Sequence, residues 1–210
     1  MGKIEITKKV LGICATNCYT VVDTETKEAL IIDPADRADV LIRDWKDKGV
    51  TPQAVLLTHG HFDHIGALAG VKKEYPDIKV YAAAEEKEVM ESPALNLSSS
   101  FGAAFTAQAD IYLEDGAEIE VLGRTCKCLL VPGHTKGGMC YYFPEEKVVF
   151  TGDTLFCYSV GRTDFPTGDA KALEEAIREK LFTLPDETLV LPGHDAQTMI
   201  GKEKKGNPYF

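Results

Sequence analysis

The sequence predicts a mixed α/β domain in which helices cover layers of β-sheet. Short apolar runs typical of buried strands alternate with amphipathic helical segments in both halves of the chain. Neighbouring strand candidates joined by polar turns add antiparallel pairs, which favours helices on β layers over an all-β sandwich. No repeat, low-complexity tract or proline- or glycine-rich linker divides the chain. We therefore expect one domain spanning residues 1–210.

The first half of the chain alternates between strand and helix patterns. The predicted strands are residues 3–10, 19–22, 29–32, 54–57 and 79–82, and the predicted helices are residues 35–48, 65–75 and 84–91. The first helix has a start signal at Asp33 and Pro34 and a stop signal at Gly49. Its Leu41 and Trp45 share one face, so we expect that face to pack on a sheet.

Residues 93–107 differ in kind, because they mix apolar and small polar residues without a period. A loop of this length in a compact domain is often a lid over a site, and its apolar residues would equally suit the contact of a homodimer. Beyond this loop, strands are predicted over residues 118–122, 126–131, 139–143, 147–150 and 188–191. Asp169 is the predicted N-cap of the last helix, whose Leu173, Ile177 and Leu181 share one face.

The chain carries 33 acidic and 23 basic side chains, a formal net charge of −10. Such a surface repels phosphate backbones, which argues against nucleic acid as a partner. No apolar run approaches the roughly 18 residues of a membrane span, and the first residues lack the apolar core of a signal peptide. We therefore expect a cytoplasmic protein with no membrane partner, whose six cysteines are reduced thiols serving as small buried apolar residues.

All five histidines belong to short motifs. Three lie in the segment Thr-His-Gly-His-Phe-Asp-His at residues 58–64, and a Pro-Gly-His motif ends at both His134 and His194. A Thr-Gly-Asp motif ends at Asp153. Each motif follows a predicted buried strand, and strand ends that share one edge of a sheet converge on one cleft. The glycine before the functional residue permits the sharp turn that aims its side chain.

The motifs supply seven side chains of the kind that bind metal ions. They are His59, His61, Asp63, His64, His134, Asp153 and His194. Imidazole nitrogens and carboxylate oxygens without cysteine suit zinc, iron or manganese. Seven ligands are too many for one tetrahedral ion, but they suit two ions about 3.5–4 Å apart that share a carboxylate and a hydroxide. We therefore expect two divalent ions, zinc first, which lower the pKa of a shared water so that hydroxide is available at neutral pH.

These motifs resemble those of the metallo-β-lactamase superfamily, and within it the glyoxalase II-like branch. The resemblance covers nearly the whole chain, from Asn17-Cys18-Tyr19 to Asn207-Pro208. It implies a four-layer αββα sandwich with the metals at one edge of two sheets. The ligands it implies are His59, His61 and His134 for the first ion, Asp63, His64 and His194 for the second, and Asp153 as the bridge.

Other branches of the superfamily fit the sequence less well. Nucleases of this fold carry extra domains and basic surfaces, and flavodiiron oxygen reductases carry an attached flavin domain. Lactamases generally lack the bridging aspartate and carry a secretion signal. A protein that binds metal without catalysis would be expected to lack a ligand, whereas all seven are present here.

Two activities are compatible with the resemblance. The first is hydrolysis of a small-molecule thioester such as S-lactoylglutathione, in which a metal-bridging hydroxide attacks the carbonyl carbon and Asp63 orients that hydroxide. The alternative is a persulfide dioxygenase-like enzyme with a single iron on His59, His134 and Asp153. The tail of the chain and its short length are more similar to the short bacterial hydrolases, so we expect the hydrolase.

Arg162 and Lys136 are the candidate substrate-binding residues. Full-length glyoxalase II enzymes hold the glutathione carboxylates with a C-terminal helical extension, whereas only sixteen residues follow His194 here. Either cation could pair with a substrate carboxylate instead. The competing interpretations are that Arg162 forms an ion pair with Asp164 or Asp169, and that Lys136 is a solvated loop lysine.

Overall fold

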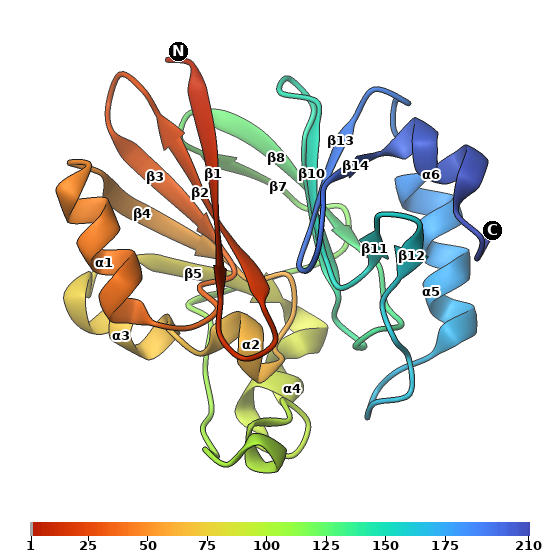
Figure 1. The fold of residues 1–210 in the computed structure, drawn as a ribbon, viewed down its shortest axis with the longest axis horizontal. Coiled ribbons are helices and arrows are strands. Elements are labelled where there is room, and N and C mark those ends of the chain that lie inside the picture. Colours follow the sequence, from red (N-terminus) through yellow and green to blue (C-terminus); the bar gives the residue numbers. More distant parts are fainter. Residues whose placement is uncertain (1) are drawn as a thin grey trace.

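Two six-stranded sheets pack face to face, and helices cover the outer face of each (Figure 1). The computed structural model describes residues 2–210. The first sheet contains, in spatial order, β1 (Ile4–Leu11), β2 (Thr16–Asp23), β3 (Glu28–Ile32), β4 (Thr51–Leu56), β5 (Lys79–Ala83) and β6 (Ile111–Leu113). The second contains β14 (Thr198–Met199), β13 (Leu189–Pro192), β10 (Val148–Gly152), β9 (Met139–Phe143), β8 (Arg124–Leu130) and β7 (Glu118–Val121).

The helices fall into three groups. α1 (Ala38–Asp47) and α3 (Leu68–Glu74) cover the first sheet, and α5 (Ala170–Ala176) and α6 (Ile200–Gly206) cover the second. A π-helical turn at Ile177–Leu181 extends α5. The lower part of Figure 1 holds the short α2 (Phe62–Ile65) and α4 (Lys87–Glu91), with 3₁₀ turns at Ala84–Glu86 and Ser98–Phe101. A small hairpin of β11 (Leu155–Phe156) and β12 (Ser159–Val160) follows β10.

Three apolar clusters fill the spaces between the four layers. Along β3, alternate side chains enter different clusters: Ile31 faces the helices, while Leu30 and Ile32 face the second sheet. Trp45 of α1 is fully buried against the first sheet, and its indole N–H donates to Thr20 Oγ1 at 3.1 Å. Burying a large apolar side chain of this kind contributes about 1.5–3 kcal/mol. The expected αββα sandwich is therefore confirmed.

Strand direction brings several strand ends to one edge. β3 to β6 run parallel to one another, and β10 runs parallel to β13. The two sheets are tied together just after β4, where the Tyr141 hydroxyl donates to the Leu57 carbonyl at 2.8 Å. The Met139 N–H donates to the Thr58 carbonyl at the same distance of 2.8 Å. These bonds fix the segment after β4 against the second sheet.

The structure corrects two predicted helices. The first begins at Ala38 rather than at residue 35, because Asp33 and Arg37 have left-handed backbone conformations with φ of 49° and 55°. An L-residue helix does not run through such positions. The single helix predicted over residues 65–75 is two helices, and the first of them already begins at Phe62.

Several short elements were not predicted: β6, β14, α6 and the hairpin β11–β12. The strands have only two or three residues each, too few to show a period. α6 contains three lysines and one glutamate, and only Ile200 among its side chains is large and apolar. The predicted cap of α5 is confirmed, since Asp169 Oδ1 accepts the N–H groups of Lys171 and Ala172 at 3.0 Å each.

The segment at residues 93–107 is fixed by hydrogen bonds around one buried side chain. Asn96 Nδ2 donates to the Phe105 carbonyl at 2.9 Å, and its Oδ1 accepts the Ser98 N–H at 2.9 Å. The Asn96 carbonyl accepts the N–H of Phe62 at 2.8 Å. The segment is therefore joined to the start of α2, and its expected role as a lid or as a dimer contact stays a prediction.

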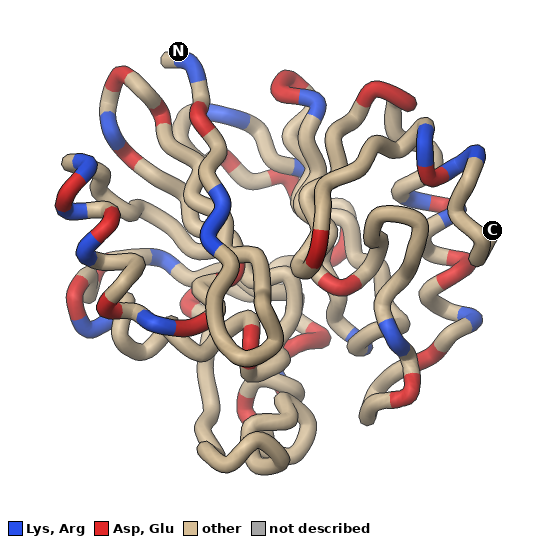
Figure 2. Tube along the Cα trace, viewed as in Figure 1, with Lys and Arg blue, Asp and Glu red and all other residues tan. Residues whose placement is uncertain are grey.

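Lysine and arginine residues are distributed among acidic residues around the outer helices and loops (Figure 2). Within residues 2–210, no helix is long and apolar enough to cross a membrane. All six cysteines are free thiols. Four of them are buried as expected, whereas Cys14 and Cys157 are partly exposed, so these two do not serve as buried apolar residues.

Candidate metal centre

All seven predicted ligands lie in tightly spaced groups at the edge where strand ends meet. His59 and His61 follow β4, and the chain then enters α2. His134 follows β8, Asp153 follows β10, and His194 follows β13. The strand ends thus bring together side chains that are more than 130 residues apart in the sequence, as the motif positions predicted.

The first cluster consists of three imidazoles. His59 Nε2 lies 3.1 Å from His61 Nδ1, and His134 Nε2 lies 2.9 Å from the same atom. All three residues are at most 4% exposed. Burial, together with the neighbouring imidazoles, lowers the pKa of His59 well below its ordinary value and that of His61 to about 3. Neutral rings with converging nitrogen lone pairs are suited to a cation.

Hydrogen bonds on the outer nitrogens fix the two outer rings of this cluster. His59 Nδ1 lies 3.2 Å from Thr58 Oγ1. His134 Nδ1 lies 2.7 Å from the carbonyl oxygen of Arg162, which can only accept, so this nitrogen carries the proton. The Nε2 atom of His134 is then left with its lone pair directed toward the centre of the cluster. Partners of this kind set the tautomer of a metal-binding histidine.

The second cluster combines His64 and His194 with two carboxylates. His194 Nε2 lies 3.5 Å from Asp63 Oδ2 and 3.3 Å from Asp153 Oδ2. His64 Nε2 lies 3.3 Å from Asp153 Oδ1. Asp153 Oδ2 is also 3.5 Å from His134 Nε2 of the first cluster. Asp153 is therefore the one carboxylate that reaches both clusters, as expected of a bridging ligand.

Charge differs sharply between the clusters. Burial opposes a positive charge on His64, but the carboxylates of Asp63, Asp153 and Asp33 outweigh it and raise the pKa of His64 well above its ordinary value. The pKa of His194 is also raised, because Asp153 offsets the effect of burial. Burial likewise opposes the charge of Asp153, yet His64 and His194 hold its pKa well below the usual range. Unlike the first cluster, the second therefore contains carboxylates, and their negative charge attracts cations.

Asp33 is a site residue that the sequence analysis used only as a helix start signal. Its side chain is buried, and Oδ2 lies 2.8 Å from His64 Nδ1. The same oxygen accepts the Thr58 hydroxyl at 2.6 Å, and Oδ1 accepts the Thr58 N–H at 2.8 Å. Since Thr58 Oγ1 contacts His59, Asp33 supports one ring in each cluster. Its place directly after β3, at the same sheet edge, was the available signal.

Glu86 is the second site residue that sequence reasoning missed. Its side chain is fully buried, and Oε1 accepts the N–H of Gly60, which lies between His59 and His61. Oε2 accepts the hydroxyl of Thr135, the residue after His134, at 2.9 Å. One carboxylate therefore joins the two loops that carry the first cluster. Burial raises the pKa of Glu86 to about 7.

The β1–β2 hairpin supports the second cluster. The Thr16 hydroxyl donates to Asp63 Oδ2 at 2.7 Å. Asn17 donates from Nδ2 to the Pro192 carbonyl at 2.9 Å and from its N–H to the Gly193 carbonyl at 2.7 Å. Asn17 therefore holds the turn that precedes His194. The segment around Asn17 carried part of the family resemblance, although it had no assigned role.

The residues present fit divalent cations. His64 Nε2 and Asp153 Oδ1 are buried, lie 3.3 Å apart, and have no hydrogen-bond partner within the described chain. Buried polar atoms are normally paired, so two such atoms facing each other would suit a cation bound by both. The three converging imidazoles of the first cluster give the same indication. The donor set of nitrogen and oxygen suits zinc, iron or manganese.

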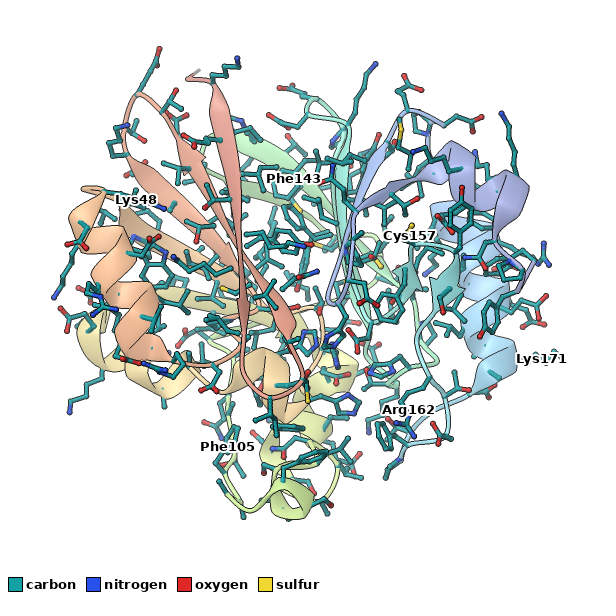
Figure 3. All side chains as sticks on the ribbon, in the orientation of Figure 1. Lys48, Phe105, Phe143, Cys157, Arg162 and Lys171 are labelled. Atoms are coloured by element: carbon teal, nitrogen blue, oxygen red, sulfur yellow. The ribbon has the colours of Figure 1, made fainter. Side chains whose placement is uncertain are left out.

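A cavity of about 440 Å³ opens in front of the ligands. Arg162 lines it, on the segment that follows β12 in the lower part of Figure 3. The Arg162 guanidinium makes two hydrogen bonds of 2.7 Å with Asp164. This is one of the two ion pairs predicted as the alternative to substrate binding by Arg162. Lys136 is paired with Glu88 and is not among the residues lining this cavity.

Comparison with known proteins places this site in a large group of enzymes. The family model of the metallo-β-lactamase superfamily matches residues 11–194. The probable metallo-hydrolase YqgX of Bacillus subtilis is 38% identical over 202 residues, covering 95% of this chain and 94% of its own length. The hydroxyacylglutathione hydrolase GloC of Haemophilus influenzae is 36% identical over 200 residues, with 92% of each chain covered.

Solved structures match along nearly the whole chain. BLEG-1, a B3 metallo-β-lactamase, has a TM-score of 0.92 and 39% identity, covering 98% of this chain and 99% of its own. TTHA1623, solved in a di-iron-bound form, has a TM-score of 0.85 and 36% identity, covering 97% and 100%. ETHE1 from Myxococcus xanthus has a TM-score of 0.78 and 30% identity, covering 97% and 83%.

The superfamily match spans every predicted ligand from His59 to His194, and the ligands meet at one edge of an αββα sandwich. The chain therefore belongs to the metallo-β-lactamase superfamily and is a metallo-hydrolase of that fold.

Proposed function

We propose that this metallo-hydrolase cleaves small-molecule thioesters of the hydroxyacylglutathione type with two divalent metal ions. The observation that carries the proposal is the position of Asp153, whose two oxygens lie within 3.5 Å of nitrogens from both clusters. Identity of 36% to the hydroxyacylglutathione hydrolase GloC supports the substrate class. The ligands are those predicted: His59, His61 and His134 for one ion, Asp63, His64 and His194 for the other, and Asp153 for both.

The bound ions would supply a Lewis acid for the substrate carbonyl and a water of lowered pKa at neutral pH. The chain's own residues position the reactants. Asp63, held by Thr16, is placed to orient the attacking water. Water adds to the thioester carbon and the carbon–sulfur bond breaks, which gives a carboxylic acid and a thiol. The Arg162 carbonyl accepts from His134 Nδ1 and so orients the His134 ring.

Arg162 and Lys136 remain proposed substrate-binding residues. A substrate carboxylate could pair with either cation only by displacing Asp164 or Glu88. Arg162 has the better position, since it lines the cavity. A cytoplasmic location, a homodimer and a single domain over residues 1–210 are further proposals that follow from the sequence.

Two other activities have support from individual relatives. The 30% identity to ETHE1 supports a persulfide dioxygenase-like reaction with one iron on His59, His134 and Asp153. TTHA1623 was solved with two irons bound, which supports iron as a metal that such sites can hold. BLEG-1 is a lactamase at 39% identity, so lactam hydrolysis has to be measured as well, although we expected lactamases to differ at the bridging aspartate.

The test is hydrolysis of S-D-lactoylglutathione by protein stripped of metal and reloaded in parallel with zinc, manganese and ferrous iron. Loss of the thioester absorbance is followed with and without oxygen. We expect turnover that does not need oxygen. Oxygen uptake with glutathione persulfide, or hydrolysis of a chromogenic cephalosporin, in the absence of thioester turnover would overturn the proposal in favour of the corresponding alternative.

A further inference from the structure

Aromatic side chains from separate segments flank the cavity in front of the ligands. The rings of Phe62 and Phe101 stack with centroids 4.4 Å apart and planes inclined by 23°. Phe165 lies edge-on to the His61 ring at 5.9 Å, and Phe156 lies edge-on to the His194 ring at 6.1 Å. Four phenylalanine rings therefore line the cavity together with the predicted metal ligands.

The wall formed by Phe62 and Phe101 is built into the fold. Phe62 directly follows His61 in the chain, and its N–H donates to the Asn96 carbonyl at 2.8 Å. Buried Asn96 also fixes the segment that presents Phe101, through its bonds to Ser98 and Phe105. These bonds join the wall to the loop that carries His61, although Phe101 itself is 51% exposed.

Half-exposure of a stacked aromatic ring leaves apolar surface available at the cavity mouth. Isolated exposed apolar residues are ordinary on protein surfaces. Here, however, the exposed ring stands over a concave site together with Leu97 and Val160. Concave sites with apolar walls and a few polar groups are typical of small-molecule binding.

Outside the ligand clusters, the side chains that line the cavity offer little free positive charge to an anionic ligand group. Arg162 is the only lysine or arginine among the residues that line the cavity in the described chain. Its guanidinium is held by Asp164 through two hydrogen bonds and stacks over the Phe165 ring at 3.8 Å from the centroid. Asp195 adds a further carboxylate to the lining. The positive charge outside the ligand clusters is therefore already compensated.

We propose that the cleft between the Phe62–Phe101 wall and Phe165 binds an uncharged apolar or aromatic group of the substrate, with Phe101 as the residue that sets this specificity. The inference rests on the proposed thioester hydrolysis for the reaction that the bound group undergoes. The binding preference itself can be measured without that reaction. It predicts that a neutral aryl-bearing thioester is a better substrate than the lactoyl thioester of glutathione, whose tripeptide carries two carboxylates.

The binding arm of the test uses thioethers, which cannot be hydrolysed. Calorimetry on the metal-loaded protein compares S-benzyl-N-acetylcysteamine with S-methyl-N-acetylcysteamine and with S-benzylglutathione. We expect S-benzyl-N-acetylcysteamine to bind about tenfold more tightly than either S-methyl-N-acetylcysteamine or S-benzylglutathione. A difference of this size is what one additional apolar contact contributes to affinity. Equal affinity of the benzyl and methyl thioethers, or tighter binding of S-benzylglutathione, would overturn the inference.

The variants test whether Phe101 is responsible. Phe101→Ala should reduce the preference for benzyl over methyl to within about twofold, and Phe101→Leu should restore part of it, because the leucine keeps apolar surface. Tyr158→Ala is the matched control, since Tyr158 is 50% exposed and does not line the cavity. A preference that survives in Phe101→Ala, or one lost equally in Tyr158→Ala, would contradict the assignment.

The kinetic arm uses phenylacetyl and lactoyl thioesters, each on glutathione and on N-acetylcysteamine. We expect Phe101→Ala to raise KM for the phenylacetyl thioesters more than for the lactoyl thioesters, with a smaller change in kcat. Turnover of all four thioesters at equal efficiency would overturn the inference alone. Selective binding of the benzyl thioether with no turnover of any thioester would overturn the proposed function alone.

Discussion

The two ligand clusters lie side by side but differ in charge and in support. The first contains only imidazoles, and burial together with neighbouring imidazoles lowers the pKa of His59 and His61. Glu86 joins the loops that carry this cluster. The second contains Asp63, and the carboxylates around it raise the pKa of His64 and His194. A cation in the second cluster would be neutralised in part by the carboxylates of Asp63 and Asp153. A cation in the first cluster would have only the shared carboxylate of Asp153 to offset its charge.

Replacing Asp153 by alanine should have the largest effect on this arrangement, because among the described residues Asp153 is the carboxylate whose own oxygens lie within 3.5 Å of ring nitrogens in both clusters. We expect a loss of turnover well beyond the roughly 10–100-fold typical of outer partners of a metal site. Metal content measured by mass spectrometry should fall below two ions per chain. Asp186→Ala, which removes an exposed carboxylate paired with Lys204, is the control. Full metal content with full turnover in Asp153→Ala would refute the bridging role.

Glu86→Gln tests the frame of the first cluster through the pH dependence of stability. Burial raises the folded-state pKa of Glu86 from 4.5 to about 7, so folding favours the protonated form. The stabilisation is complete below pH 4.5 and is lost as the pH rises to about 7. For the metal-free protein this amounts to a decrease of about 3 kcal/mol in the free energy of unfolding. Urea unfolding at pH 5, 6, 7 and 8 should show this decrease in the wild type relative to Glu86→Gln. Parallel pH profiles of the two proteins would show that Glu86 keeps its ordinary pKa.

Asp33→Asn should weaken both clusters, because Asp33 contacts His64 directly and reaches His59 through Thr58. We expect metal affinity to fall roughly 10–100-fold, measured by competition with a chelator. Thr58→Val sharpens the comparison, since it leaves the bond from Asp33 to His64 in place. It should weaken only the ion in the first cluster. If Asp33→Asn lowers the affinity only for the ion in the second cluster, Asp33 supports that cluster alone.

Arg162→Ala should have the smallest effect. Its exposed ion pair with Asp164 is of a kind worth about 0–1 kcal/mol, and the carbonyl that holds His134 belongs to the backbone and stays. We expect a modest rise in KM that is larger for glutathione thioesters than for neutral N-acetylcysteamine thioesters, because only the former carry carboxylates that Arg162 can pair with. Equal changes in KM for both would remove Arg162 from the substrate site. A rise in KM for the glutathione thioesters alone would support Arg162 as the residue that binds a substrate carboxylate. Lys136→Ala can be assayed in the same way.

The grouping of the seven candidate ligands could be predicted from sequence because each belongs to a motif that directly follows a buried strand. His134 and His194 are marked by the same Pro-Gly-His motif, and strand direction then places both at one edge. Asp33 could not be recognised in this way, since an aspartate before a proline equally marks the start of a helix. Its left-handed backbone, with φ of 49°, turns its side chain into the site instead.

Glu86 shows a different limit. Nothing near it in the sequence indicates burial, because its partners Gly60 and Thr135 belong to loops brought together only by the complete fold. The same holds for α6, whose lysine-rich sequence gives little sign of the contact made by fully buried Ile200. Local patterns predicted the layers and the edge where the candidate ligands meet, whereas long-range polar contacts decided how these side chains are held.

The most direct test of two unequal clusters that share one carboxylate is a calorimetric titration of the metal-free protein with zinc, carried out beside His194→Ala. The account predicts two ions per chain with distinct affinities in the wild type. His194→Ala should retain one ion, bound by the three imidazoles of the first cluster with Asp153. A single ion per chain in the wild type, bound with the same affinity by His194→Ala, would contradict it.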